Sequence, residues 1–207
     1  HPVQVESVAW ITERKNLLSG LFYFLSLYFF LHFYNPDKPL NFNENQNGKR
    51  PWTIYGVSLF FFLCALWSKT VTSTLPAVIL LIHWWKQNCI RKKIFLMMIP
   101  YFTLSFGFAI ITIQLEKFAG AIGREWDFSF LDRFLIAGRA LWFYIGKLVW
   151  PNPIIFIYPR WVIDSSIWWQ YIYPVTFLLL IFMLWYWRKN IGRGPLTAIL
   201  FFAGSLF

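Results

Sequence analysis

The chain has 207 residues, of which 58% are hydrophobic and only 14% are charged, and its formal net charge is +10. The charges are gathered between long uncharged runs, which excludes an ordinary soluble domain, whose charges are spread over its surface. The excess of positive charge does not indicate nucleic-acid binding, because the basic clusters are short and stand at the ends of apolar runs. That placement is typical of the cytoplasmic edges of membrane spans.

Six uncharged runs have about the length of membrane spans. A helix needs about 20 mostly apolar residues to cross bilayer hydrocarbon, which is about 30 Å thick, and it satisfies its own backbone hydrogen bonds in lipid. With flanking polar residues, the runs predict spans at about 17–34, 52–67, 71–85, 94–115, 168–187 and 195–207. We therefore expect an all-α, polytopic transmembrane bundle of about six spans plus one interfacial or re-entrant helix.

The interfacial or re-entrant helix is expected at residues 132–150, which are long enough to cross but carry four charges. If the basic segment 86–93 is cytoplasmic, a crossing at 132–150 would leave the basic segment 188–193 outside. An interfacial or re-entrant helix keeps 188–193 inside and obeys the positive-inside rule better. Three segments then share the outer face: 1–16, 68–70 and 116–164.

Two carboxylates in the polar lead-in are candidates for chemistry. On a helix, Glu6, Glu13 and Asn16 fall at i, i+7 and i+10 and share a face. Two carboxylates beside a membrane can serve as a base and its orienting group, or can bind cations. The alternative is that they are solvated among lipid head groups, with Arg14 and Lys15 as counter-ions.

Lys69 stands alone between two apolar runs, without an acidic neighbour in the sequence. Its ammonium needs water or an anion, and a lipid-linked phosphate at the interface would suit it. The hydroxyls of Thr70, Thr72, Ser73 and Thr74 could add donors at a helix start. The alternative is a lysine that snorkels from the end of a span.

Arg133, Arg139 and Lys147 form a second basic set. A charge such as Arg139 in an apolar stretch is costly unless it is paired or hydrated. It either pairs with Asp132, Asp127 or another acidic group, or helps to hold a diphosphate. Most of the tryptophans suit an interfacial aromatic belt.

The two cysteines, Cys64 and Cys89, have no metal-ligand partner at short spacing, so we expect neither a disulfide nor a metal site.

Three stretches of the chain resemble a known family. The segment His1–Trp10, continuing through Glu13–Ser19, resembles bacterial multi-span membrane proteins that carry tetratricopeptide repeats, and these are similar to the eukaryotic transmembrane and tetratricopeptide-repeat O-mannosyltransferases. Both resemble GT-C glycosyltransferases, which take a sugar from a polyprenyl-phosphate donor. The weaker matches are 66–70 with 75–77, and 139–141 with 147–151 and 158–159.

The resemblance implies a role for particular residues. Glu6 and Glu13 would border the sugar-transfer site as catalytic carboxylates. The substrate-binding residues would be His1, Arg14, Lys69, Arg133, Arg139 and Tyr158. The family often has Asp where this chain has Asn16. If that carboxylate takes part in catalysis, its replacement by an amide lowers the activity of this chain.

The resemblance also implies that residues 1–207 are a single, partial transmembrane domain. The catalytic first outer loop, which usually supplies the base, would precede residue 1, and the tetratricopeptide repeats would follow residue 207.

The function we expect is sugar transfer from a polyprenyl-phosphate donor to a protein or glycan acceptor on the outer or lumenal face. The setting would be the bacterial inner membrane, or the endoplasmic reticulum membrane in a eukaryote. Membrane lipid, the lipid-linked sugar and the acceptor are the expected partners, without nucleic acid and without a cofactor. The alternatives are a transporter or flippase of lipid-linked sugars and a non-catalytic scaffold for the repeats. The interpretation requires Glu6, Glu13, Lys69 and Arg139 to meet at one rim of the bilayer.

Overall fold

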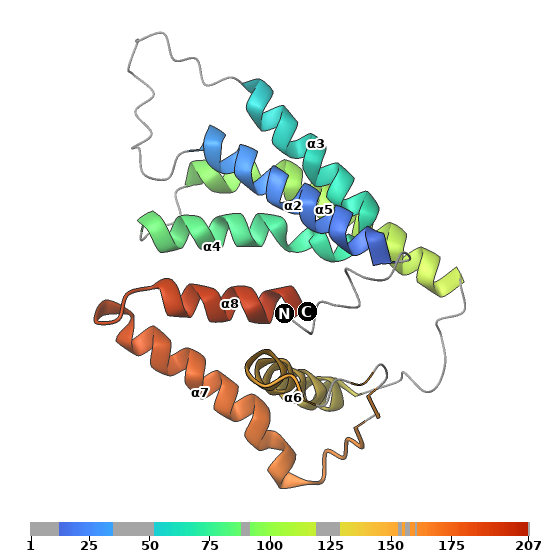
Figure 1. Ribbon diagram of the computed structural model, residues 1–207, viewed down its shortest axis with the longest axis vertical. Coiled ribbons are helices and arrows are strands. Elements are labelled where there is room, and N and C mark those ends of the chain that lie inside the picture. Colours follow the sequence, from blue (N-terminus) through green and yellow to red (C-terminus); the bar gives the residue numbers. More distant parts are fainter. Residues whose placement is uncertain are drawn as a thin grey trace. The chain divides into compact units, whose positions relative to one another are not determined.

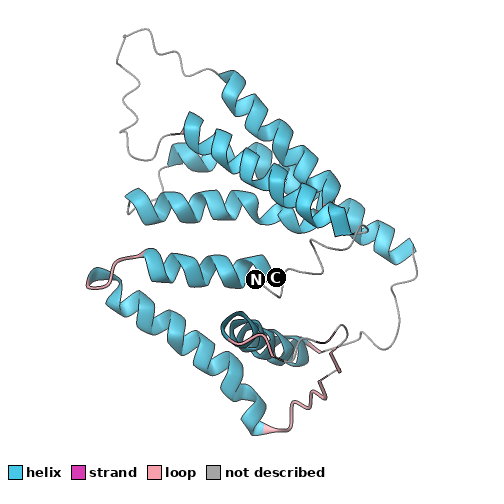
Figure 2. Ribbon diagram, viewed as in Figure 1, coloured by secondary structure: helices cyan, strands magenta, loops and turns pink. Residues whose placement is uncertain are grey.

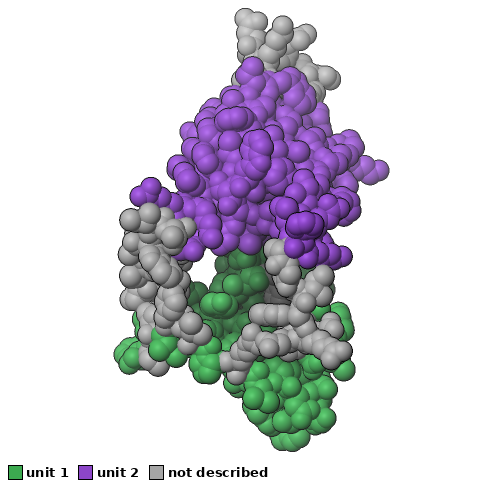
Figure 3. Space-filling view, turned by 90° about the vertical axis from the view of Figure 1, so that its right-hand side faces the viewer, with its two compact units in different colours: residues 1–9, 119–207 green, residues 10–118 purple. Residues whose placement is uncertain are grey.

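The computed structural model describes residues 13–34, 52–87, 92–118, 129–152, 155, 158–159 and 161–206. All regular structure in these ranges is helical (Figures 1 and 2). The chain divides into two compact units (Figure 3). We call Trp10–Phe118 the first unit, which is purple and marked unit 2 in the key of Figure 3, and His1–Ala9 with Ala119–Phe207 the second unit, which is green and marked unit 1. The expected all-α class is therefore confirmed.

The described part of the first unit contains four α-helices and one 3₁₀ helix. They are α2 (Arg14–Phe33), α3 (Trp52–Ser68), η3 (Thr70–Thr74), α4 (Leu75–Gln87) and α5 (Lys92–Phe118). Pro76 lies in the first turn of α4, where a missing backbone N–H costs least.

The described part of the second unit contains three α-helices and two 3₁₀ helices. They are α6 (Phe130–Val149), η5 (Trp168–Tyr171), α7 (Ile172–Tyr186), η6 (Trp187–Lys189) and α8 (Gly194–Leu206). A capping box begins α6: Asp132 N donates to Ser129 Oγ at 3.2 Å, and Ser129 N donates to Asp132 Oδ2 at 3.1 Å. The turn before α8 contains Gly192, whose φ of 90° is a conformation that glycine adopts without a Cβ clash.

Three helical stretches of the described residues are long and apolar enough to span a membrane: Arg14–Phe33, Lys92–Phe118 and Trp168–Lys189. Many of their large side chains are exposed, such as Phe106 at 69% and Leu179 at 59%, as expected of surfaces that face lipid. The described part of the chain is thus helical, with three helical stretches whose length and composition suit a membrane span.

The other three expected spans have the predicted lengths, but each of their α-helices has fewer than the roughly 20 residues that cross bilayer hydrocarbon. α3 and α8 are apolar but have 17 and 13 residues. The run at 71–85 begins as the 3₁₀ helix η3 and continues as the 13-residue α4. Its hydroxyl side chains give the change of helix type a local cause, because Thr72 and Thr74 donate to the backbone carbonyls three residues earlier.

The helix α6 differs from the three span-length helices because it is amphipathic, with an apolar face and a charged face. This pattern is the one expected of an interfacial helix. That α6 does not cross the bilayer stays a prediction.

The order of contacts fixes the directions of the helices in the first unit. Tyr55 OH donates to Met97 O at 2.8 Å, and the rings of Trp67 and Phe108 lie 6.5 Å apart, so α3 and α5 run parallel. In contrast, α2 is antiparallel to both, because its last residue, Phe33, packs on Trp52 at the start of α3 with ring centroids 5.6 Å apart. The start of α2, the end of α3 and the end of α5 therefore lie at the same end of this unit.

The end of α4 lies at the opposite end of the first unit. Its His83 ring is 5.3 Å from the ring of Tyr34, which directly follows α2. Lys86, in the last turn of α4, is therefore at the other end of the unit from Lys69.

Small polar side chains hold α2, α3 and α5 together inside the apolar core. Ser26 Oγ donates to Ser58 O at 2.8 Å, and Ser58 Oγ bonds to Ser26 O at 2.6 Å and lies 2.7 Å from Tyr101 OH. The core around this network includes Phe30 and Phe62, both fully buried. Serine allows close approach of helix backbones, which is a common basis of helix association in membranes.

In the second unit, α6 and α7 approach most closely at Gly138. A Cβ atom built on Gly138 would lie 2.6 Å from both Cβ and N of Pro174, so any larger residue would collide with the α7 backbone. Trp142 Nε1 also donates to Tyr173 O at 3.0 Å. Glycine is therefore what allows these two helices to pack at this distance.

Candidate functional site

The connection between α3 and η3 holds the backbone of Lys69 firmly and leaves its side chain exposed. Lys69 has an extended backbone, with φ −161° and ψ 124°, and its N–H donates to Ala65 O at 2.9 Å. Its carbonyl accepts from Thr72 N at 3.2 Å and from Thr72 Oγ1 at 2.7 Å. The sequence correctly predicts a tight connection here.

Asn16 links the Lys69 side chain to Glu13. Lys69 Nζ donates to Asn16 Oδ1 at 2.8 Å, and Asn16 Nδ2 donates to Glu13 Oε2. The backbone of Asn16 is in the first turn of α2, and its carbonyl accepts from Ser19 Oγ at 2.9 Å. A carboxylate and an ammonium are thus held at the same end of the first unit by one neutral amide, a chain of contacts that we name the Glu13–Asn16–Lys69 relay.

The relay positions the ammonium of Lys69 without neutralising it. In the described part of the chain, no carboxylate lies within ion-pair distance of Lys69. The carboxylate of Glu13 forms an ion pair with Lys15 instead, with 3.8 Å between Oε1 and Nζ. Arg14 and Lys15 are exposed beside it. Three cations and one carboxylate at a helix start give a net positive charge, which attracts an anion from the surrounding water.

Two of the hydroxyls after Lys69 donate to backbone carbonyls of the same segment. Thr72 Oγ1 donates to Lys69 O and Thr74 Oγ1 donates to Val71 O at 3.3 Å. Each hydroxyl has one hydrogen, and in a 3₁₀ helix the carbonyl three residues earlier is within its reach. The prediction that hydroxyls in this segment donate to a bound anion stays a prediction.

A second candidate cluster lies on one face of α6 in the other unit. Arg139, Phe143 and Lys147 stand at i, i+4 and i+8 and share that face. The Arg139 guanidinium carbon is 4.8 Å from the ring centroid of Trp161 and 5.9 Å from that of Tyr173. Cation–π contact therefore stabilises this charge, and among the described residues Arg139 forms no ion pair.

The rest of this aromatic cluster surrounds Phe143. Its ring centroid is 5.0 Å from that of Tyr158 and 5.5 Å from that of Trp161, both at steep angles. Lys147 Nζ lies 5.4 Å from the centroid of Tyr158. Tyr158 thus belongs to the same cluster as Arg139, as the prediction of a shared role requires.

Asp132, one of the acidic partners expected for Arg139, has another role. Its carboxylate completes the capping box of α6 and accepts from Ser129 Oγ at 2.7 Å. In the described residues it forms no ion pair with Arg139. The other expected partner, Asp127, lies outside the described residues.

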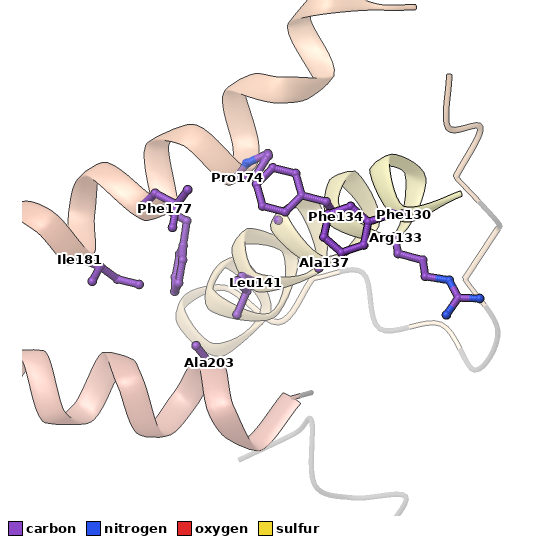
Figure 4. Close-up of a pocket in the computed structure, with 11 residues that line it drawn as sticks. Phe130, Arg133, Phe134, Ala137, Leu141, Pro174, Phe177, Ile181 and Ala203 are labelled. Carbon is purple, nitrogen blue, oxygen red and sulfur yellow. The ribbon is translucent and has the colours of Figure 1, made fainter. Parts of the chain in front are cut away.

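Arg133 does not share the face of Arg139, because six residues separate the two and a helix turns by 3.6 residues. It lies beside an apolar groove of about 540 Å³ between α6, α7 and α8 (Figure 4). The groove is lined by Phe130, Arg133, Phe134, Ala137, Gly138, Leu141, Pro174, Phe177, Leu178, Ile181 and Ala203. The basic set expected from the sequence is therefore divided: Arg133 lies at the groove, and Arg139 and Lys147 lie in the aromatic cluster.

The predicted site residues fall into three groups. Glu13, Arg14 and Lys69 lie at the same end of the first unit, and Arg133, Arg139 and Tyr158 belong to the second. His1 and Glu6 lie outside the described residues.

Two residues with a part in these clusters, Asn16 and Trp161, were not among the predicted catalytic and substrate-binding residues. The position of Asn16, three residues after Glu13, was the available signal for one contact of the relay, because helical residues three apart are neighbours. Nothing in the sequence indicated that Trp161 would cover Arg139, since that contact depends on the path of the chain after α6.

The described residues contain no group of three or more His, Cys, Asp or Glu side chains that could hold a metal ion. Comparison of the chain with protein-family models, with curated proteins and with solved structures finds no match.

Proposed function

We propose that the chain is part of the membrane domain of a GT-C-type glycosyltransferase. The enzyme moves a sugar from a polyprenyl-phosphate donor to a protein or glycan acceptor. The reaction takes place at the outer or lumenal face of a bacterial inner membrane or an endoplasmic reticulum membrane. The Glu13–Asn16–Lys69 relay carries this proposal. It puts a carboxylate together with an ammonium that pairs with no carboxylate of the described residues, at one end of a set of apolar helices.

The chemistry of sugar transfer needs both kinds of charge. The acceptor hydroxyl loses a proton while it attacks the anomeric carbon, and the bond from that carbon to the phosphate oxygen breaks. A carboxylate can accept the proton, and Glu13 would assist Glu6 and the base expected before residue 1. Lys69 and Arg14 would stabilise the negative charge that grows on the departing lipid phosphate, which accelerates the reaction because it strengthens in the transition state.

The proposed bundle of about six spans requires η3 and α4 to cross together. A 3₁₀ helix rises about 2.0 Å per residue and an α-helix about 1.5 Å, so the five residues of η3 and the thirteen of α4 extend over about 30 Å. This length equals the hydrocarbon thickness of a bilayer. The greater rise of η3 compensates for the small number of residues.

In the proposed enzyme, Arg139 and Tyr158 bind a further part of the donor or acceptor, together with His1. The rings of Trp161 and Tyr173 lie within cation–π distance of the Arg139 guanidinium, whose N–H groups lie in its own plane and are the groups that would bind a phosphate with two parallel hydrogen bonds.

The test is a transfer assay with the full-length protein in proteoliposomes, with polyprenyl-phosphate mannose and polyprenyl-phosphate glucose as donors. We expect Lys69→Ala to lower turnover about 100-fold, the usual effect of removing one group that stabilises the transition state. The matched control is Lys117→Ala, because Lys117 is an exposed cation at the same end of the unit but outside the relay.

Each contrary result has a distinct meaning. Unchanged turnover of Lys69→Ala would remove Lys69 from the site. Movement of the labelled donor across the bilayer without sugar transfer would overturn the proposal of an enzyme and would favour a transporter or flippase. If neither process occurs with the wild-type protein, a scaffold for repeats is the better interpretation.

A further inference from the structure

The position of the Lys69 ammonium depends on the backbone that carries it. Lys69 Nζ donates to Asn16 Oδ1 at 2.8 Å between two elements, since Asn16 belongs to α2 and Lys69 follows α3. A lysine side chain is long and flexible, so the direction of its Cα–Cβ bond decides how well it reaches one partner. At Lys69 the backbone leaves the helical conformation, with φ −161° and ψ 124°, and this conformation needs its own support.

Thr72 supplies that support through the Lys69 carbonyl. Its Oγ1 donates to Lys69 O at 2.7 Å, and its N–H donates to the same oxygen at 3.2 Å. The angle ψ of Lys69 determines where this carbonyl points, so two bonds to the oxygen hold ψ at its extended value. Thr72 is buried, with 7% of its surface exposed, so water is poorly placed to replace the hydroxyl.

The short helix that contains Thr72 is itself bonded to another helix of the first unit. Ser105 Oγ of α5 donates to Ser73 O at 3.2 Å, directly beside Thr72 in η3. Thr72 in turn holds the backbone of Lys69, whose ammonium bonds to Asn16 of α2. Hydrogen bonds therefore connect α5 through η3 to the relay.

We propose that Thr72 is a positioning residue for the Lys69 ammonium: its buried hydroxyl holds the Lys69 carbonyl and thereby directs Nζ to Asn16. The single hydrogen of this hydroxyl bonds to Lys69 O, so the hydroxyl acts through Lys69. This role follows from the described residues of the first unit alone. Only its effect on sugar transfer rests on the proposed function.

The first test measures how fast an amine-acylating reagent modifies Lys69 of the full-length protein in proteoliposomes, with mass spectrometry as the readout. Thr72→Val removes the hydroxyl and keeps the size and branching of the side chain. We expect Lys69 to react about twofold faster in this variant, a modest effect because the Thr72 N–H still holds the carbonyl. Thr72→Ser keeps the hydroxyl and should restore the wild-type rate.

A double-mutant cycle with Asn16 separates positioning of the ammonium from simple support of η3. If Thr72 directs Nζ to Asn16, Thr72→Val has nothing left to disturb once Asn16→Leu has removed that contact. The double variant should then react as fast as Asn16→Leu alone, whereas two independent effects would multiply.

The matched control is Thr112→Val. Thr112 Oγ1 makes the same kind of bond, to Phe108 O at 2.9 Å, but it is outside the relay. This variant should leave the Lys69 acylation rate unchanged.

A second test uses the sugar-transfer assay and rests on the proposed function. Thr72→Val should lower turnover about threefold in the wild-type background and have no further effect in Lys69→Ala, because Thr72 works only through that ammonium. If the wild-type protein transfers no sugar, the proposed function fails, while the acylation cycle still decides the role of Thr72.

Several results would overturn the proposal. A wild-type rate of Lys69 acylation in Thr72→Val would show that the hydroxyl does not hold the ammonium. A double variant whose rate is the product of the two single effects would show that Thr72 supports η3 without directing Nζ. A rate in Thr72→Ser as high as in Thr72→Val would exclude the hydroxyl as the cause. Thr72→Ala, which lacks the hydroxyl and has less bulk, decides the same points if Thr72→Val does not fold.

Discussion

A single neutral side chain controls the electrostatics of the candidate site. The amide of Asn16 accepts a hydrogen bond from Lys69 and donates one to Glu13, which an amide can do and a carboxylate cannot. An aspartate at position 16 would pair directly with the ammonium and would repel Glu13. The amide therefore keeps Glu13 and Lys69 close without making them an ion pair.

This arrangement predicts opposite effects of two substitutions at Asn16 on the chemical reactivity of Lys69. Asn16→Leu removes the hydrogen bond that holds Nζ, so we expect an amine-acylating reagent to modify Lys69 about threefold faster, a modest effect because the bond is exposed. Asn16→Asp pairs the ammonium with a carboxylate and should slow the reaction. Mass spectrometry of the modified protein measures both rates.

Lys117 is the internal control for that measurement, because it is exposed on α5 and its rate should not change in either variant. Equal Lys69 rates in the wild type and both variants would show that the relay does not hold the ammonium in the membrane-embedded protein.

At the scale of elements, small residues determine which helices can pack. Ser26 and Ser58 allow α2 and α3 to exchange hydrogen bonds, and Gly138 allows α6 to touch Pro174 of α7. Apolar surface alone does not select these contacts, since lipid tails are as apolar as the helices. The positions of small residues therefore decide the packing.

Two glycines on α6 give matched predictions for stability. Gly138→Ala places a Cβ atom 2.6 Å from the α7 backbone, and we expect a net destabilisation of about 1–2 kcal/mol, because overpacking outweighs the helix propensity of alanine. Gly146→Ala meets no atom within 4 Å and should be neutral or stabilising by up to about 1 kcal/mol. Thermal unfolding of the purified protein in detergent compares the two variants.

A melting temperature of Gly138→Ala at or above that of Gly146→Ala would contradict the close contact of α6 and α7. The comparison is sharp because both substitutions are the same chemical change on the same helix.

At the scale of the whole molecule, the directions of the helices predict which residues face the same side of the membrane. Single cysteines at Lys69 and Lys117 should react with a membrane-impermeant maleimide from one side, and a cysteine at Lys86 from the other, because α3 and α5 run parallel and α4 ends at the opposite end of the unit. The background protein carries serine at Cys64 and Cys89. Labelling of intact and of permeabilised vesicles gives the side for each position.

Labelling of positions 69 and 86 from the same side would show that η3 and α4 do not cross the bilayer together. That outcome would reduce the proposed number of spans and leave the relay itself intact.

The sequence was a good guide to the helices and a partial guide to the site. It predicted helices where the structure has them and the tight connection at Lys69. It did not predict the change of helix type at η3 or the separation of Arg133 from Arg139. Both depend on local hydrogen bonds and helix rotation, which a count of apolar residues does not contain.

The sequence by itself determined the helical class and the presence of helices long and apolar enough to span a membrane, because long uncharged runs are stable in lipid only as helices. Only the tertiary structure decided the Glu13–Asn16–Lys69 relay, the stacking of Arg139 on Trp161 and the contact of Gly138 with Pro174. The physical reason is that α2, α3, α5 and α7 are apolar on all sides. A helix without a distinct apolar face gives no sign of which side packs inward, so the pairing of side chains is set only when the helices come together.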